Sequence, residues 1–320
     1  MRRIAAVLAV PLLAVLALAG CGSSTTSATN QGESVKVSGA FGAAPTVTIP
    51  AAKASSKLAI KTVIQGTGPV LTSADSFVGN YAVYIWSGST HKLALTTFAH
   101  GSTQGSPQVL AANVGLTGLK EALTGKRMGS RVLAVLPPKY AYGSKGNSQI
   151  GVKPTDTIVF VVDLIKDYSG TASASGKHVS DGGGGLPTVT ASPGSAPQVK
   201  IPSTKPPRKL IVKTLIRGTG TPTAKGQTIV TQYVGLNWRT GKVFDSSWQR
   251  KEPFGFTLDA SPAQIIPGWD KGLLGVPVGS RVMLIIPPAD GYGKTGNSEA
   301  GIKPTDTLVF VIDVIGAVSN

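Results

Sequence analysis

Residues 264–274, QIIPGWDKGLL, are the stretch from which the fold of this chain can be argued. Pro267 suits the first turn of a helix, and the glycines at positions 272 and 275 limit that helix to one or two turns. Trp269 therefore lies near the start of a very short helix, where side chains from surrounding strands can converge on it. A large aromatic ring beside exposed backbone is poorly placed to fill an ordinary hydrophobic core, so this stretch predicts the floor of a pocket.

The residues around this helix have the pattern of β-strands. Runs of β-branched and aromatic residues, bounded by Gly, Pro and Asp, predict strands at residues 210–216, 228–238, 253–258, 281–287 and 307–315. Only residues 268–275 are predicted to be helical. The expected fold class is therefore α+β, with five or six antiparallel strands in a curved sheet that packs on one short helix. Trp269 is expected to fill the space between the helix and the sheet.

The chain contains the same unit twice. Residues 45–50 return as 197–202 and residues 57–62 return as 209–214, both 152 positions later. Residues 129–132 and 153–157 return 150 positions later. The offset changes in a hairpin, because residues 87–92 are two longer than the corresponding residues 239–242. A duplication explains both offsets.

The repeat and the composition predict the domain boundaries. We expect a signal peptide at 1–20, a flexible tether at 21–44, a first domain at 45–168, a linker at 169–205 and a second domain at 206–320. The linker is rich in Gly, Ser, Thr and Pro, which bury too little apolar surface to become ordered. We therefore expect two domains that mostly do not touch. The Pro-rich residues 197–207 are expected to lie extended against the second domain.

The start of the chain resembles the leader of a bacterial lipoprotein. Arg2 and Arg3 precede an apolar run at residues 4–19, which is too short to span a bilayer but suits a secretory signal. The run ends at Cys21, the only cysteine, which is followed by a Ser/Thr-rich stretch. The resemblance to a lipobox implies that Cys21 carries acyl chains that hold the protein on the extracytoplasmic face of the cell membrane.

The composition limits the other partners. The net charge of +16 favours anionic surroundings, but the lysines are spread along the chain, as on an ordinary soluble surface. No cluster of arginine and aromatic residues suggests a nucleic-acid groove, so no nucleic acid is expected. The three histidines have no metal-ligand spacing, and nothing in the sequence calls for a metal or another cofactor.

Five short motifs of the second copy carry a resemblance to a known family. They are QYVG at 232–235, GKVFDSS at 241–247, IIPGW at 265–269, GYG at 291–293 and LVF at 308–310. In this order and spacing, the second copy resembles the FKBP-type peptidyl-prolyl cis-trans isomerases from residue 210 to residue 315. The whole chain thus resembles a lipoprotein with two tandem FKBP-like domains.

The resemblance implies a set of site residues in the second domain. Trp269 would be the floor on which a substrate proline rests, Tyr292 and the backbone N–H of Ile266 would donate hydrogen bonds to substrate carbonyls, and Ile302 would line a flap. Asp245, held by Arg250 and Tyr233, would be the only carboxylate in the pocket. The walls would be formed by Tyr233, Phe244, Phe254, Ile266 and Phe310. Ordinary structural interpretations stay open for Trp269 as core and for Asp245 as part of a turn. A core role is favoured for Phe256, and the register of the motifs argues against one for Phe310.

The first copy departs from this set. It retains Tyr81, Tyr142 and Phe160. Counting back by 150 positions, the residues that stand in place of the others are Ala94 for Phe244, Leu95 for Asp245, His100 for Arg250, Gln104 for Phe254 and Leu119 for Trp269. We therefore expect a first domain with the same fold, a degenerate pocket and little or no isomerase activity.

Two classes of function follow. The leading one is a membrane-anchored peptidyl-prolyl cis-trans isomerase that acts on X-Pro segments of exported proteins, and the family resemblance implies macrolide inhibitors as further ligands. The alternative is a peptide-binding chaperone or an envelope scaffold without significant turnover. The intact Phe244, Asp245, Trp269 and Tyr292 favour the enzyme, whereas the degenerate first domain favours a share of binding.

Overall fold

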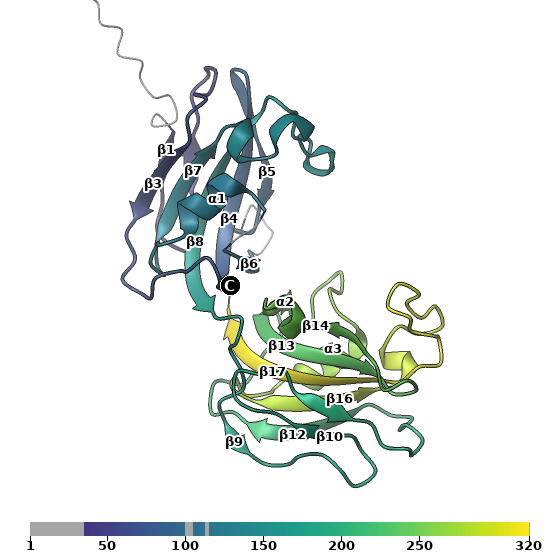
Figure 1. The fold of residues 1–320 in the computed structure, drawn as a ribbon. Coiled ribbons are helices and arrows are strands. Elements are labelled where there is room, and N and C mark those ends of the chain that lie inside the picture. The colour runs from purple at the N-terminus through teal and green to yellow at the C-terminus, as the bar shows by residue number, and fades with distance from the viewer. Residues whose placement is uncertain (1–34, 100–104, 113–114, 320) are drawn as a thin grey trace, which may run out of the picture.

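The computed structural model describes residues 35–99, 105–112 and 115–319. These residues form two domains of the same architecture, each an antiparallel sheet with a short helix on one face (Figure 1). Domain 1 comprises the described residues from 35 to 168, and domain 2 comprises residues 177–319. Within the described residues, no helix is both long and apolar enough to cross a membrane.

The sheet of domain 1 has the strand order β3-β7-β8-β4-β5, and β6 pairs with the other part of β4. Its helix, α1, is Thr117–Leu123. The strands are β3 (Ala59–Ile64), β4 (Ser76–Ser87), β5 (Thr90–Thr96), β6 (Gln108–Ala111), β7 (Arg131–Leu136) and β8 (Thr157–Tyr168).

Domain 2 repeats this order as β12-β16-β17-β13-β14, with β15 on β13 and the two-residue strand β9 (Lys177–His178) at the other edge. The strands are β12 (Ile211–Arg217), β13 (Thr228–Asn237), β14 (Val243–Ser246), β15 (Phe254–Thr257), β16 (Arg281–Ile286) and β17 (Leu308–Val318). The predicted α+β fold is confirmed. Strand β14 was not predicted from the sequence. The prediction of a single helix is wrong, because Ser247–Arg250 makes the single turn α2.

The helix α3 (Pro267–Leu273) lies unusually close to the sheet because two of its residues have no side chain. A Cβ on Gly268 would come within 2.7 Å of Ile286, and a Cβ on Gly272 would come within 2.7 Å of Leu284. Pro267 occupies the first turn, as the sequence predicts. Trp269 is 4% exposed and fills the space between helix and sheet. This packing fixes the indole ring at the base of the pocket.

The opposite face of each sheet is covered by a hairpin that lies upstream in the chain. In domain 1 the hairpin consists of β1 (Lys36–Ser38) and β2 (Thr46–Thr48), and in domain 2 of β10 (Thr188–Thr190) and β11 (Gln198–Lys200). The indole N–H of Trp86 donates to the carbonyl of Ala52 at 2.8 Å, and that of Trp238 donates to the carbonyl of Thr204 at 3.1 Å. The repeated unit therefore includes the hairpin.

The hairpins correct two of the expected boundaries. Residues 169–205 are not a flexible linker throughout, because β9, β10 and β11 form there and Val189 is 4% exposed against the sheet. Their composition hides an alternation, in which Val189 and Val199 point inward between polar neighbours and bury one side of the hairpin. The expected tether ends earlier than residue 44, since Val35 is already buried in domain 1.

The two domains touch, contrary to the expectation from the linker. Val78 and Tyr168 of domain 1 form a buried cluster with Val230 of domain 2, and the ends of β8 and β17 meet there (Figure 1). The hydroxyl of Thr228 donates to the carbonyl of Pro107 at 2.7 Å. Strand β6 of domain 1 also lies against β15 of domain 2.

A buried ion pair occurs at the same place in each sheet. Arg131 contacts Asp163 at 2.6 Å, and Arg281 contacts Asp313 at 2.5 Å. Arg131 further donates to the carbonyls of Gly39 and Ala43 in the turn of the first hairpin. The pair in domain 1 therefore joins the sheet to the hairpin that covers it.

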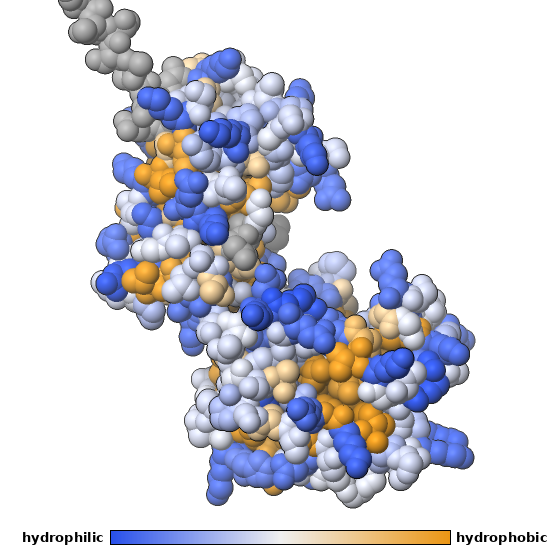
Figure 2. Space-filling model, viewed as in Figure 1, coloured by the Kyte–Doolittle hydropathy of each residue, from blue (hydrophilic) through white to orange (hydrophobic). Residues whose placement is uncertain are grey.

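The surface agrees with the spread of lysines in the sequence. Hydrophilic side chains are distributed over both domains in the view of Figure 2, and domain 2 also exposes an apolar area there.

Candidate functional site

Domain 2 contains a cavity of about 290 Å³ between its sheet and the start of α3. Eight of the ten predicted site residues line it, namely Tyr233, Phe244, Asp245, Phe254, Ile266, Trp269, Tyr292 and Phe310. Arg250 lies outside the lining and reaches it through Asp245. Ile302 is buried in the neighbouring core instead of lining the cavity. The cavity is also lined by Ala263, Gln264 and Ile265, which were not predicted as site residues although two of them lie in the stretch 264–274.

Trp269 is the centre of an aromatic cluster. Its ring meets Tyr233 edge-on at 5.1 Å and Phe310 edge-on at 5.2 Å between centroids. Phe310 in turn meets Phe244 at 5.5 Å and 89°. Gly235, on β13, makes room for both phenylalanines, since a Cβ there would come within 2.7 Å of Phe310 and 2.9 Å of Phe244. The rings hold each other at fixed angles, so the cavity has rigid apolar walls.

The only carboxylate of the cavity is Asp245, which sits in a three-residue network. The Tyr233 hydroxyl donates to Asp245, and Arg250 forms an ion pair with Asp245 and donates to the Tyr233 oxygen at 2.9 Å. Burial, followed by the hydrogen bond to Asp245, raises the pKa of Tyr233 to about 12. The Arg250 and Asp245 side chains are 46% and 40% exposed, so their pair adds little to stability. It orients the tyrosine and the carboxylate instead.

The turn that carries this network is anchored from behind. The backbone N–H of Tyr233 donates to the Ser247 hydroxyl at 2.8 Å, and that hydroxyl donates to the side chain of Gln232 at 2.5 Å. Gln232 donates in turn to the carbonyl of Gly170, which lies between the domains, at 2.8 Å. The pocket wall is thus connected by hydrogen bonds to the junction of the two domains.

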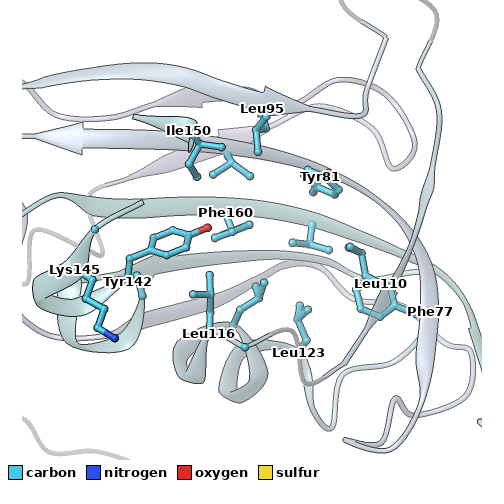
Figure 3. A pocket seen from close by; sticks show the side chains of 16 residues that line it. Phe77, Tyr81, Leu95, Leu110, Leu116, Leu123, Tyr142, Lys145, Ile150 and Phe160 are labelled. Atoms are coloured by element: carbon cyan, nitrogen blue, oxygen red, sulfur yellow. The ribbon is translucent and has the colours of Figure 1, made fainter. Parts of the chain in front are cut away.

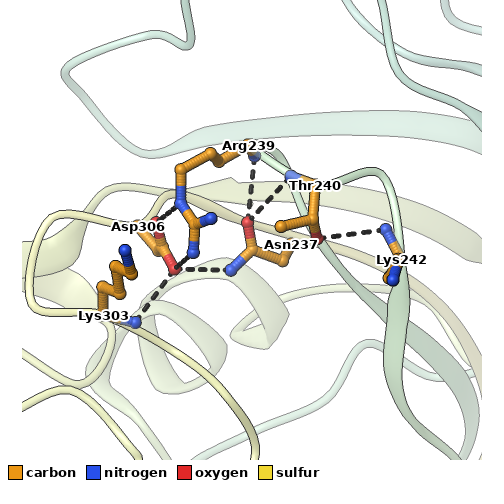
Figure 4. Close-up of polar contacts among 6 residues, drawn as sticks. All are labelled: Asn237, Arg239, Thr240, Lys242, Lys303 and Asp306. Atoms are coloured by element: carbon orange, nitrogen blue, oxygen red, sulfur yellow. Dashed lines mark hydrogen bonds and ion pairs between the residues drawn. The ribbon is translucent and has the colours of Figure 1, made fainter.

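A second polar network fixes the segment that follows Ile302 (Figure 4). Asp306 accepts from the side chain of Asn237 at 2.6 Å, from two nitrogens of Arg239 at 2.7 and 2.8 Å, and from the backbone N–H of Lys303 at 2.9 Å. The Arg239 guanidinium holds the pKa of Asp306 well below its usual value, more strongly than burial raises it. The network ties the loop between β16 and β17 to the end of β13.

We expect Asp306 to make domain 2 sensitive to acid. Its pKa is lower in the folded state, so its contribution to stability is complete above the ordinary value and is lost as pH falls below about 4. Replacing Arg239 by Gln moves the folded pKa back toward that value and should destabilise domain 2 at neutral pH. Tryptophan fluorescence during urea unfolding, at pH 7 and at pH 3, measures the difference.

The control is Arg217→Gln, which removes the same charge from an exposed position of β12. Arg239→Gln should cost more stability at pH 7 than at pH 3, because at pH 3 Asp306 is largely protonated in the unfolded chain and part of the benefit of its charge in the fold is already lost. Arg217→Gln should show no such change with pH. Equal losses at both pH values would contradict the assigned role of Asp306.

Domain 1 also contains a cavity at the equivalent place, of about 560 Å³ (Figure 3). Tyr81, Tyr142 and Phe160 line it, as do Leu95 and Leu119. The strand register supports the replacement of Asp245 by Leu95, because Leu95 faces Val83 on β4 as Asp245 faces Gly235 on β13. It also supports the replacement of Phe244 by Ala94, which directly precedes Leu95. The pocket has lost its carboxylate but has not closed.

One replacement was assigned to the wrong residue. Gln108, and not Gln104, occupies the place of Phe254, because Gln108 pairs with Gly79 on β4 as Phe254 pairs with Thr231 on β13. Eleven residues separate β5 from β6, whereas seven separate β14 from β15. The segment before α1 is four residues shorter than the one before α3, which restores the offset of 150 at Leu119. His100 and Gln104 lie outside the described residues.

The rim of the domain 2 cavity offers hydrogen-bond donors without internal partners. Within the described residues, neither the hydroxyl of Tyr292 nor the backbone N–H of Ile266 forms a hydrogen bond. An apolar slot with two free donors at its rim suits an apolar ring flanked by peptide carbonyls. The fold and the site therefore define a pocket that suits a polypeptide segment with an apolar ring.

The comparisons with known proteins identify the family. The sequence model of the FKBP-type peptidyl-prolyl cis-trans isomerases matches residues 87–165 and 220–315, together more than half of the chain. This chain belongs to that family and is a peptidyl-prolyl cis-trans isomerase with two FKBP domains.

Two relatives are similar to one domain of the chain. The FK506-binding protein of Streptomyces anulatus is 42% identical over 119 residues, which are 37% of this chain and 94% of that protein. The probable FK506-binding protein of Corynebacterium glutamicum is 37% identical over 121 residues, which are 38% of this chain and 98% of that protein. Among solved structures, FkpA from Escherichia coli is 36% identical with a TM-score of 0.31 and covers 34% of this chain and 48% of its own.

Proposed function

We propose that domain 2 carries the isomerase turnover of this protein. The observation that supports this is the single cavity formed by Phe244, Asp245, Phe254, Trp269 and Phe310. The equivalent cavity of domain 1 has Leu95 and Leu119 in its lining and no carboxylate. Of these two cavities, as the described residues form them, only that of domain 2 has an indole ring and a carboxylate in its lining.

The reaction needs no nucleophile. Rotation about an X-Pro bond must break amide resonance, and its barrier is about 18–20 kcal/mol, with tens to hundreds of seconds per event. The twisted amide is less polar than the planar one, so an apolar site favours it relative to water. In the proposed complex, the proline ring rests on Trp269, and Tyr292 and the N–H of Ile266 hold the flanking carbonyls. Lowering the barrier by roughly 5–8 kcal/mol gives about four to six powers of ten in rate.

Asp245 acts on this site through its partners. It accepts from the Tyr233 hydroxyl and pairs with Arg250, so the Tyr233 ring is fixed between Trp269 and Phe254. The carboxylate also places a negative charge beside the twisting amide. The contacts that strengthen as the amide twists are the ones that accelerate the reaction.

We further propose that the protein works on the outer side of the cell membrane on newly exported polypeptides. The support is the leader, in which a short apolar run ends at Cys21. Cys21 lies outside the described residues. Thirteen residues lie between Cys21 and Val35, the first described residue, and such a length of chain reaches at most roughly 50 Å. Domain 1 would then stay close to the bilayer.

Replacing Cys21 by Ser tests the anchor. We expect the wild-type protein in the membrane fraction of a bacterial host and the variant in the soluble or secreted fraction, because the acyl chains provide the membrane affinity. Isomerase activity is measured in each fraction as the acceleration of a refolding reaction that proline isomerisation limits. We expect this activity in whichever fraction contains the protein. Ser23→Ala is the control and should remain membrane-bound. A Cys21→Ser variant that stays in the membrane would contradict the proposal.

A second candidate function is peptide binding without turnover. The large cavity that persists in domain 1 favours it for that domain.

A further inference from the structure

The cavity of domain 1 is deeper than that of domain 2. It runs from Tyr142 and Ile150 at one end to Phe77, Leu110 and Leu123 at the other (Figure 3). The equivalents of the last three residues in domain 2 lie outside the pocket lining. The two cavities therefore share an entrance, and only the first extends further between helix and sheet.

The additional depth comes from three missing aromatic rings. In domain 2, Phe256 stacks on Phe254 at 5.7 Å and meets Trp269 at 5.6 Å between centroids, which closes the inner end. By strand register and helix position, domain 1 has Gln108, Leu110 and Leu119 at these places. The smaller side chains leave the volume open.

The lining of the domain 1 cavity also differs from that of domain 2 in its polar groups. The place of Asp245 is taken by Leu95, so the hydroxyl of Tyr81 has no carboxylate partner and forms no hydrogen bond within the described residues. Apart from this hydroxyl, the side-chain polar groups among the described lining residues are those of Tyr142 and Lys145, both at one end (Figure 3). The inner end offers apolar contact only.

The entrance retains the features that suit a polypeptide. Tyr142 stands where domain 2 has Tyr292, and its hydroxyl points into the cavity beside Phe160 (Figure 3). Leu116 stands where domain 2 has Ile266, immediately before the helix, and its backbone N–H has no hydrogen bond within the described residues. The donors for two peptide carbonyls are therefore present in both domains.

We propose that the cavity of domain 1 binds a polypeptide through one bulky apolar side chain, of the size of leucine, phenylalanine or tryptophan, without selecting proline. The guest side chain occupies the volume that Phe256 and Trp269 fill in domain 2, and the Tyr142 hydroxyl and the Leu116 N–H hold the adjacent carbonyls. This inference rests on the proposed function only in taking an unfolded polypeptide as the ligand. Domain 1 would then hold a segment whose prolines domain 2 isomerises.

The test uses the two-domain chain without its leader and short, soluble, fluorescein-labelled peptides that contain no proline. The peptides differ at one central position, which is Ala, Leu, Phe or Trp, and fluorescence anisotropy measures their affinity. We expect the Leu, Phe and Trp peptides to bind at least about tenfold more tightly than the Ala peptide, as the burial of such a side chain predicts. Equal affinity of all four peptides would overturn the proposal.

The variant Leu110→Phe with Leu119→Trp fills the cavity with the residues of domain 2. We expect it to lower the affinity for the large side chains to that of the Ala peptide, while its melting temperature stays unchanged or rises, since the cavity is filled. Leu93→Phe, on β5 and outside the lining, makes a similar change in size and should leave binding unchanged. Full binding by the filled variant would also overturn the proposal.

Two further outcomes are separable. If oleate binds more tightly than any peptide and loses its affinity in the filled variant, the cavity is a site for acyl chains and the proposal fails. Binding should be unaffected by Phe244→Ala with Asp245→Leu in domain 2. A protein that binds these peptides but has no turnover in domain 2 would refute the proposed function alone, and turnover without binding would refute this inference alone.

Discussion

The variant Phe244→Ala with Asp245→Leu loses between about tenfold and a hundredfold of kcat/KM for an X-Pro peptide, although its fold is intact. It gives domain 2 the two residues that domain 1 has at these places, Ala94 and Leu95. The change removes the ring that meets Phe310 edge-on and the acceptor of the Tyr233 hydroxyl. Losing contacts worth about 1.4–2.8 kcal/mol in the transition state corresponds to this range.

The measurement is cis/trans exchange of a short X-Pro peptide, followed by NMR with the two-domain chain. The reverse change in domain 1, Ala94→Phe with Leu95→Asp, is the matched control and should add no turnover, because Gln108 and Leu119 remain in place of Phe254 and Trp269. Near-UV circular dichroism and thermal melting confirm that both variants fold. Wild-type exchange rates in the Phe244→Ala, Asp245→Leu variant would show that turnover does not depend on this pocket.

Much of the fold could be predicted because local patterns and the structure agree. The β-branched run of residues 228–238 forms β13, and Pro267 begins α3 as expected. Of the hairpin of β10 and β11, only the extended segment around β11 was predicted. The strand β10 and the pairing were not, because the apolar residues there are few among Gly, Ser and Thr. Only their alternate spacing gives the hairpin an apolar side. The single turn α2 is too short to show a helical period.

The candidate site could be predicted where the motifs keep their spacing. The volume of the domain 1 cavity could not be predicted, because it depends on the combined size of several side chains. Counting back by a constant offset assigned Gln104 instead of Gln108, because one segment of domain 1 is longer and the next is shorter by the same amount. The open cavity of domain 1 depends on the combined absence of the rings at Gln108, Leu110 and Leu119. Each replacement alone suggests a poorer pocket, whereas together they leave a larger one.

We expect Arg281→Ala to destabilise domain 2 by about 3–5 kcal/mol, the usual cost of leaving a buried charge without its partner. The side chains of Arg281 and Asp313 are 6% and 1% exposed and share two hydrogen bonds of 2.5 and 2.7 Å. Asp313 would keep only the backbone N–H of Ala174, at 3.0 Å. Urea unfolding, followed by the fluorescence of domain 2 tryptophans in a Trp86→Phe background, measures the loss.

The cost should come from the unpaired charge and not from lost packing, which a double variant can show. Arg281→Met with Asp313→Leu removes both charges at similar volume, and it should recover most of the stability. In domain 1, Arg131→Ala should cost at least as much as Arg281→Ala, because Arg131 also donates to Gly39 and Ala43 and so holds the β1–β2 hairpin on the sheet. A double variant as unstable as Arg281→Ala would mean that the guanidinium contributes through packing.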